Sequence, residues 1–272
     1  MKREEELGAV VEFEAVRFTD AGAREETVHV PSEVPLTIEA NGVEVATLLC
    51  TPTEIPSLVL GFLFSAGVVR GPGELRDVSV DPTRWKVECT VARTPDVELL
   101  GKRVYTSGCG KGVMFATVAE LAGRRPLESP LRVPASRIDD LARALQGASP
   151  HYRRSRGIHT GAVSLEGELP QRWFDDVGRH NAVDKAIGDA LFRGVDLSRC
   201  LLLSSGRTSS EVLHKARRAG IPVVLSRSVP THQSVLRARD MGITLIGRAK
   251  GAGFLAYAHP ERIVPNRPPA QG

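Results

Sequence analysis

The chain has 272 residues, of which 42% are hydrophobic and 25% charged, with a net charge of +4. This composition is typical of a soluble globular protein with one large domain or two small ones. No run of about 18 apolar residues occurs, which predicts no membrane contact. The start, MKREEELGAV, holds no apolar segment, so we expect no secretory leader and a cytoplasmic location. Aromatic content of 5% argues against a nucleic-acid partner.

The first half of the chain, residues 8–104, reads as a small β-rich domain. Residues 1–25 are polar and predict a frayed start, and strand patterns begin at residue 26. Two alternating runs flank Asn41-Gly42, which predicts a hairpin because both residues tolerate a positive φ. Residues 77–92 supply two further alternating strands.

One helix is expected to pack on this small sheet, over the apolar run 56–64. Thr51 or Thr53 is predicted to cap it. Cys50 and Cys89 lie among apolar positions, which favours buried and chemically inert thiols.

The second half, residues 113–272, alternates helices with short apolar strands. This order predicts an α/β sheet with parallel pairs, so the fold class expected is a two-domain α+β or α/β protein. Helices are predicted over 112–123, 136–148 (with Ser136 as its N-cap), 181–194, 209–220 and 231–242. Strands are predicted over 161–167, 200–205, 221–228 and 243–249.

Three small, polar and cationic turns follow buried strands of this half, at 204–211, 226–232 and 247–253. Ligands of such sheets lie beyond the carboxyl ends of the strands. Glycine and hydroxyl residues at a helix N-terminus offer free N–H groups to a phosphate, and arginine adds a forked donor. We therefore expect a phosphate-bearing ligand. The candidate residues are Ser205, Gly206, Arg207, Ser209, Arg227, Ser228, Thr231, Arg248, Lys250, Gly251 and Gly253. No Walker-type or dinucleotide-type glycine motif is present, which disfavours ATP hydrolysis and nicotinamide chemistry.

A further polar cluster occupies WFDDVGRHNAVDK, residues 173–185. Its candidates for a supporting role in the site are Asp176, Arg179, His180, Asn181 and Lys185. The alternative is a capped and salt-bridged helix start, and for Asp184 an ordinary ion pair is expected. His159 lies in the stretch SRGIHTG just before a strand, where a structural role is as common as a functional one.

Cys109 lies in the glycine-rich stretch YTSGCGKG, residues 105–112, which predicts a flexible cysteine loop. A thiol there gains little from packing, so its use lies in reactivity, which requires the thiolate. Lys111 would stabilise that thiolate. The loop holds too few ligands for a metal site, and none is predicted. Nucleophile, redox thiol and sulfur carrier remain open, beside a thiol that merely tucks under the loop.

Several stretches resemble the FdhD/NarQ family, the formate dehydrogenase accessory sulfurtransferases. They run in family order from about residue 33 to 263 and include TSGCGKG, GIHTGAV, DVGRHNAVDK, SGRTSSE and GITLIGRAKGAG. The resemblance implies a small β-rich domain followed by a cytidine-deaminase-like three-layer α/β domain.

The resemblance also implies an activity. Family members take sulfur from a cysteine desulfurase as a persulfide and pass it to the bis-molybdopterin guanine dinucleotide cofactor of formate dehydrogenase. Cys109 would carry the persulfide. Residues 248–253, including Ala249 and Ala252, would bind the cofactor, which a guanine nucleotide is expected to mimic. A homodimer is implied as well.

One departure from the family pattern concerns the cysteine loop, where many members have a CxxC pair. Here glycine occupies position 112, so an intramolecular disulfide cannot expel the sulfur, whereas single-cysteine transfer stays open. The alternative is a chaperone that binds the guanylated cofactor without chemistry. A zinc-dependent deaminase is disfavoured because the sequence holds no CxxC pair.

Overall fold

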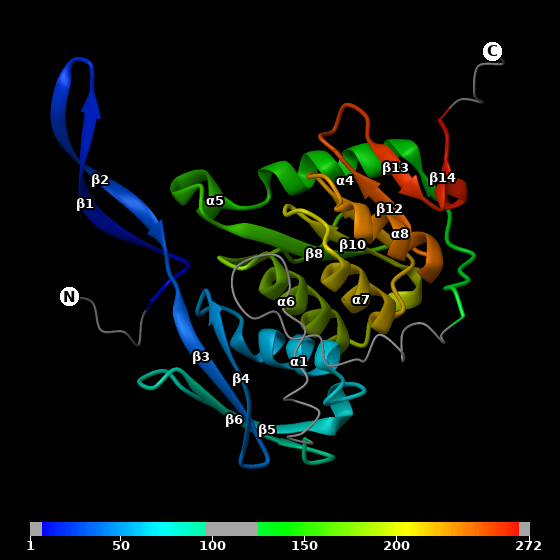
Figure 1. The fold of residues 1–272 in the computed structure, drawn as a ribbon, viewed down its shortest axis with the longest axis horizontal. Coiled ribbons are helices and arrows are strands. Elements are labelled where there is room, and N and C mark those ends of the chain that lie inside the picture. Colours follow the sequence, from blue (N-terminus) through cyan, green and yellow to red (C-terminus); the bar gives the residue numbers. More distant parts are fainter. Residues whose placement is uncertain (1–6, 96–124, 267–272) are drawn as a thin grey trace.

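The computed structural model describes residues 7–95 and 125–266. The predicted cysteine loop over 105–112 and the predicted helix over 112–123 lie outside the described residues. In the first half, a four-stranded sheet in the order β4-β3-β6-β5 packs against one helix (Figure 1). The elements of this half are β1 (Val10–Thr19), β2 (Gly22–Pro31), β3 (Val34–Ala40), β4 (Val43–Cys50), α1 (Ile55–Ala66), β5 (Leu75–Asp81) and β6 (Lys86–Val91).

The predicted hairpin at Asn41-Gly42 is confirmed. Asn41 and Gly42 have φ values of 52° and 77°, as a tight two-residue turn between β3 and β4 requires. The Asn41 side chain also exchanges two hydrogen bonds of 2.9 Å with the backbone of Val91, which ties the turn to β6. The helix expected over 56–64 is present as α1, and Gly67, with a φ of 84°, is its C-cap.

The predicted cap of α1 was wrong. Glu54, in a left-handed conformation, precedes the helix, and no side chain caps it. The Thr51 hydroxyl instead donates to the carbonyl of Ser32 and accepts from the backbone of Val177. Ser136 is likewise not a cap, because it is the second residue of its helix and Pro134 precedes the first.

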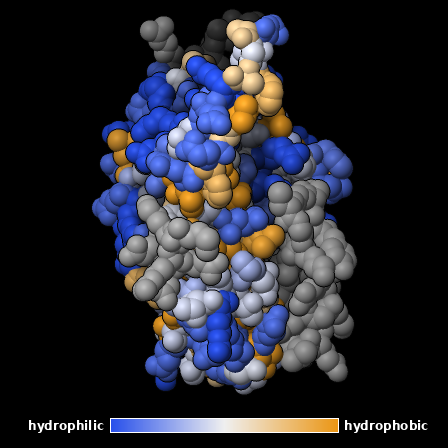
Figure 2. Space-filling view, turned by 90° about the vertical axis from the view of Figure 1, so that its left-hand side faces the viewer, coloured by the Kyte–Doolittle hydropathy of each residue, from blue (hydrophilic) through white to orange (hydrophobic). Residues whose placement is uncertain are grey.

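The frayed start predicted for residues 1–25 was also wrong, because residues 10–31 form the antiparallel hairpin β1–β2. Cross-strand contacts stabilise it, among them a bidentate ion pair between Arg17 and Glu26. The hairpin projects from the body (Figure 1), and none of its residues joins a core cluster. Charged and apolar side chains mix on this side of the molecule (Figure 2).

The second half contains a six-stranded mixed sheet in the order β13-β12-β11-β10-β8-β9. β10, β11 and β12 are parallel to one another, and β8 is antiparallel to β10. The strands are β7 (Val133–Pro134), β8 (His159–Leu165), β9 (Phe174–Asp176), β10 (Cys200–Ser204), β11 (Val223–Ser226), β12 (Thr244–Gly247), β13 (Leu255–Ala258) and β14 (Ile263–Val264). The helices are α4 (Ala135–Gly147), α5 (Pro150–Ser155), α6 (Arg179–Phe192), α7 (Ser210–Ala219) and α8 (His232–Met241).

This half has three layers. On one face of the sheet, Leu201 and Leu203 of β10 share a buried cluster with Ile138 and Leu141 of α4. On the other face, Leu202 belongs to a cluster with residues of α6, α7 and α8. That second cluster continues into α1 and the small sheet, so the two halves share one core. Within the described residues, no helix is long and apolar enough to span a membrane.

Two glycines allow α1 and α6 to cross at close range. A Cβ at Gly188 would overlap the carbonyl of Ser57, and a Cβ at Gly61 would overlap the carbonyl of Asp184. Both atoms that would be overlapped are backbone atoms, which cannot rotate away. The joint between the two halves therefore requires glycine at both positions.

We expect Gly188→Ala to destabilise the protein by about 1–3 kcal/mol, because the added methyl group must push two packed helices apart. Urea denaturation measures this loss. Gly147→Ala is the matched control, since a Cβ there meets nothing within 4 Å and should leave stability unchanged or slightly raised. Equal midpoints for wild type and Gly188→Ala would contradict the close crossing.

Candidate functional site

The three predicted turns meet at one edge of the sheet, because β10, β11 and β12 run parallel. Backbone and hydroxyl groups join them directly. The Ser226 hydroxyl donates to the carbonyl of Gly206 at 2.6 Å, and the N–H of Arg248 donates to the carbonyl of Ser228 at 2.9 Å. The turns therefore form one hydrogen-bonded surface rather than three separate loops.

Four cationic side chains lie on this surface, and we call them the edge cations: Arg207, Arg227, Arg248 and Lys250. Within the described residues, no acidic side chain lies within ion-pair distance of any of them. Arg207, Arg248 and Lys250 are exposed, whereas Arg227 is half-buried and its Nε has no hydrogen-bond partner there. Uncompensated positive charge gathered at strand ends favours an anionic ligand.

Several other candidates in the turns are already engaged. The Thr231 hydroxyl caps α8 by accepting from the N–H of Ser234 at 3.3 Å. Ala249 is fully buried, and its N–H donates to the carbonyl of Ser226. These groups hold the backbone of the turns in place, so the neighbouring side chains are the better candidates for binding a ligand.

The rest of the third turn is held by α4. Gly251 accepts a hydrogen bond of 2.6 Å from Arg143, and the N–H of Gly253 donates to Asp139 at 3.0 Å. The φ values of Gly251 and Gly253 are 83° and 100°, which favour glycine. Ala252 between them is exposed.

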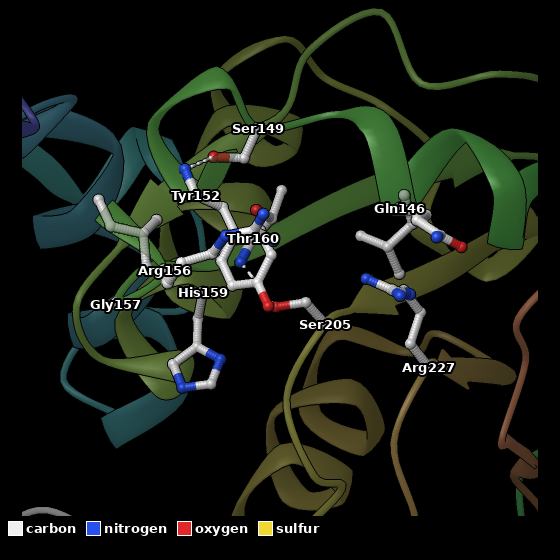
Figure 3. A pocket seen from close by; sticks show the side chains of 11 residues that line it. Gln146, Ser149, Tyr152, Arg156, Gly157, His159, Thr160, Ser205 and Arg227 are labelled. Carbon is white, nitrogen blue, oxygen red and sulfur yellow. Dashed lines mark hydrogen bonds between the residues drawn. The ribbon is translucent and has the colours of Figure 1, made fainter. Parts of the chain in front are cut away.

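A cavity of about 320 Å³ opens beside this surface (Figure 3). One wall consists of His159 and Thr160 at the start of β8 together with Ser205 and Arg227 from the turns. The other wall comes from residues 145–158, which include the end of α4 and all of α5. Among the residues that the structure describes, no aspartate or glutamate lines the cavity, and its charged lining residues are Arg156 and Arg227.

Three sequence segments that contained separate candidates converge next to the cavity. A Cβ at Gly206 would lie 2.9 Å from the Cβ of Arg179 and 3.3 Å from Nδ1 of His159. Glycine at 206 is what permits this approach. Burial and the charge of Arg179 lower the pKa of His159, so the imidazole is neutral at pH 7.

His180 bridges the starts of two helices. Its Nε2 lies 3.0 Å from the Ser209 hydroxyl, and its Nδ1 lies 3.3 Å from a carboxylate oxygen of Glu211. This is the order of groups in serine nucleophile sites. However, burial lowers the pKa of His180 to about 2, and the charges of Lys215 and Arg179 act in the same direction. An imidazole that cannot keep a proton is a poor general base, so His180 positions Ser209 at the start of α7 as a neutral bridge.

Asp176 and Lys185 form a fully buried ion pair of 2.7 Å. The ammonium also donates to the carbonyls of Thr51 and Asp175, both at 3.0 Å, so its three protons have acceptors. Asn181 joins the same cluster. Its side-chain amide donates to the Asp176 carboxylate and to the carbonyl of Leu49 in β4. These three candidates therefore lie in the joint between the two halves and do not line the cavity.

The ordinary ion pair expected for Asp184 is confirmed. Its carboxylate pairs with Lys215 of α7 and accepts a hydrogen bond of 2.8 Å from Ser65 of α1. Burial raises the pKa of Asp184, and the Lys215 charge opposes that shift. The pair fastens α1, α6 and α7 together behind the site.

Cys109 and Lys111 lie outside the described residues. Cys50, Cys89 and Cys200 are buried, and burial raises their pKa values to about 12, 11 and 12. Such thiols stay protonated and unreactive at neutral pH. The burial expected for the Cys50 and Cys89 thiols is confirmed.

The wall built by α5, where Tyr152 and Arg156 line the cavity, was not predicted from the sequence. Ser149-Pro150 is a cap followed by proline at the first helical position, a signal that could have located this helix. At six residues the helix is too short to show an amphipathic period. Its role at the cavity depends on its tertiary position.

An α/β sheet with a cationic edge defines the structural class of this protein, and comparison with known proteins gives its family. The FdhD/NarQ family model matches residues 31–264. The sulfur carrier protein FdhD of Staphylococcus aureus strain Newman is 36% identical over 251 residues, covering 92% of this chain and 94% of that protein; the protein of strain COL matches equally. This chain belongs to the FdhD/NarQ family.

A solved structure has a similar fold over most of its length. The crystal structure of a protein from Desulfotalea psychrophila, named as a formate dehydrogenase accessory protein, is similar with a TM-score of 0.77 and 25% identity. The match covers 94% of this chain and all of that one.

We expect the stability of the protein to fall as the pH drops below about 6.5, partly through His180. The unfolded chain binds a proton there, whereas the folded His180, with a pKa of about 2, does not. One such proton gives a slope of about 1.4 kcal/mol per pH unit. His180→Gln should lose this contribution in urea denaturation between pH 6 and pH 4, whereas the exposed-site control His232→Gln should keep it. An unchanged slope in His180→Gln would contradict a buried neutral imidazole.

Proposed function

We propose that this chain carries persulfide sulfur from a cysteine desulfurase to the bis-molybdopterin guanine dinucleotide cofactor and thereby matures formate dehydrogenase. Membership of the family supports the role in maturation. The relatives named as sulfur carrier protein and as formate dehydrogenase accessory protein point the same way. The cytoplasm is the compartment in which this proposal places the chain.

The edge cations are the observation that carries the binding half of the proposal. A cofactor with two guanine dinucleotide ends brings several phosphates, and arginine forks and helix N-termini are suited to phosphates. Cations without acidic partners within the described residues would remain available to such a ligand. A site for a neutral ligand gains nothing from this arrangement.

Cys109 is proposed as the carrier of the sulfur. Its thiolate attacks the outer sulfur of the desulfurase persulfide, and the desulfurase thiolate leaves. The outer sulfur of the Cys109 persulfide would then bond to the metal of the substrate cofactor as the S–S bond breaks and the Cys109 thiolate leaves. The metal, in its reduced state, would supply the two electrons that convert this sulfane sulfur to the sulfido ligand. Because position 112 is glycine, no disulfide is required or formed. The raised pKa values of the three buried cysteines disfavour them as substitutes.

The finer family features belong to the same proposal. The cytidine-deaminase-like arrangement is supported by the hairpin β8–β9 beside three parallel strands. A homodimer would suit a cofactor with two dinucleotide arms. The second candidate function is a chaperone that binds the guanylated cofactor without chemistry, because the edge cations would serve both.

Intact-protein mass spectrometry after incubation with a cysteine desulfurase and cysteine separates the two candidates. We expect wild type and Cys50→Ala to gain one sulfur, about 32 Da and removable by reductant, and Cys109→Ala to gain none. Cys50→Ala is the matched control because it removes a thiol that burial makes unreactive. No gain in wild type, with a known persulfide acceptor loading normally, would leave the chaperone as the better account.

A further inference from the structure

The β1–β2 hairpin has little support from the rest of the chain that the structure describes. Its base is held where Pro31 packs against the loop after α5, since a Cβ at Gly157 would lie 2.6 Å from the Cγ of Pro31. Beyond that base the two strands project from the body (Figure 1). An isolated two-stranded hairpin is at best marginally stable in water unless one of its faces is covered. A contact that covers one face would therefore stabilise it.

The two faces of the hairpin differ in chemistry. Paired residues share a face and successive residues alternate between faces, so the register divides the side chains into two sets. The face that we call the apolar face carries Val11, Phe13, Ala15, Val28 and Val30 and, nearer the tip, Arg17, Arg24 and Glu26. The opposite face, which we call the acidic face, carries three glutamates and no lysine or arginine; its members include Glu12, Glu14, Glu25, Val16 and Phe18.

The apolar face is open to solvent. Phe13 is 56% exposed and Val30 is 40% exposed. The cross-strand pairs Val11–Val30 and Phe13–Val28 are two residues apart along the strands, so their four side chains form one continuous patch. Contiguous exposed apolar side chains with a polar rim mark protein–protein contacts.

We infer that this apolar face is a dimer contact, covered by the same face of a second copy of the chain. The inference rests on the proposed function, which includes a homodimer but does not assign the surface that forms it. A two-fold contact sets a face against itself, so the charges of the face must tolerate their own copy. The acidic face would oppose glutamates to glutamates with no cation between them. On the apolar face Glu26 pairs with both Arg17 and Arg24, which leaves little net charge.

Charge complementarity favours antiparallel stacking of the two hairpins. A parallel stack would place the arginines of one copy on those of the other. In an antiparallel stack centred on the Phe13–Val28 pair, the arginine end of each hairpin lies over the base of its partner, where Glu33 directly follows β2. Glu33 is exposed and has no cation within ion-pair distance in the described part of the chain. Arg24 is 73% exposed and lies 3.5 Å from Glu26, so it can reach the Glu33 of a second copy.

Sedimentation equilibrium of the full chain at several protein concentrations tests the contact. We expect wild type to dimerise. Phe13→Asp should raise the dissociation constant of the dimer at least about a hundredfold, because a two-fold contact contains the change twice. Phe18→Asp is the matched control. Phe18 is the more exposed of the two, at 79%, but it lies on the acidic face, so this variant should dimerise as wild type does.

A charge exchange tests the stacking direction without removing an apolar side chain. Arg24→Glu and Glu33→Arg should each weaken the dimer, and the variant with both changes should recover the wild-type dissociation constant. Recovery would also show that the hairpin stays folded in the doubly changed variant. Failure to recover would overturn the antiparallel contact.

Three results of the sedimentation experiment would overturn the inference. They are a wild type that stays monomeric, a Phe13→Asp dimer as tight as wild type, and equal weakening by Phe13→Asp and Phe18→Asp. None of them bears on the sulfur carrier, because persulfide loading on Cys109 is read from the mass of the single chain. Absence of loading in a chain that dimerises through the apolar face would instead contradict the carrier and keep the contact.

Discussion

The buried ion pair between Asp176 and Lys185 is the contact on which the geometry of the site depends. Two buried charges are tolerated only when both are paired and hydrogen-bonded. Here the carboxylate accepts from the backbone of Thr51 and Gly178 as well as from the ammonium, and the ammonium donates to two carbonyls. Removing either partner would leave an uncompensated buried charge and cost about 3–5 kcal/mol.

The Asp176–Lys185 pair lies between the two halves and away from the cavity, yet it positions residues next to the cavity through the start of α6. Asp176 holds the N–H of Gly178, and α6 begins at the next residue with Arg179 and His180. The Arg179 side chain packs against Gly206, and His180 forms a hydrogen bond with Ser209. The glycines at 61 and 188 let α1 lie against α6, so the small domain supports the helix whose first residue contacts Gly206. The candidates of segment 173–185 thus divide into an anchoring group and a group at the site.

Local patterns in the sequence predicted what depends on local chemistry. The Asn41-Gly42 turn, the amphipathic helices and the parallel strands followed from φ preference and hydrophobic period, and parallel strands placed three cationic turns at one edge. Contacts between distant segments were beyond such reasoning. Lys185 reads as part of a polar cluster, and only the tertiary structure shows that it is buried against Thr51. The β1–β2 hairpin was missed because it buries no face in the core.

The most direct test of the account follows labelled sulfur to its destination. Protein loaded on Cys109 with ³⁵S persulfide would be mixed with guanylated cofactor that lacks its sulfido ligand and with apo formate dehydrogenase. The account predicts that ³⁵S moves to the cofactor and that formate oxidation appears, with Arg227→Gln slower and Cys109→Ala inactive. Label that stays on the protein while dehydrogenase activity appears would contradict sulfur transfer by this chain.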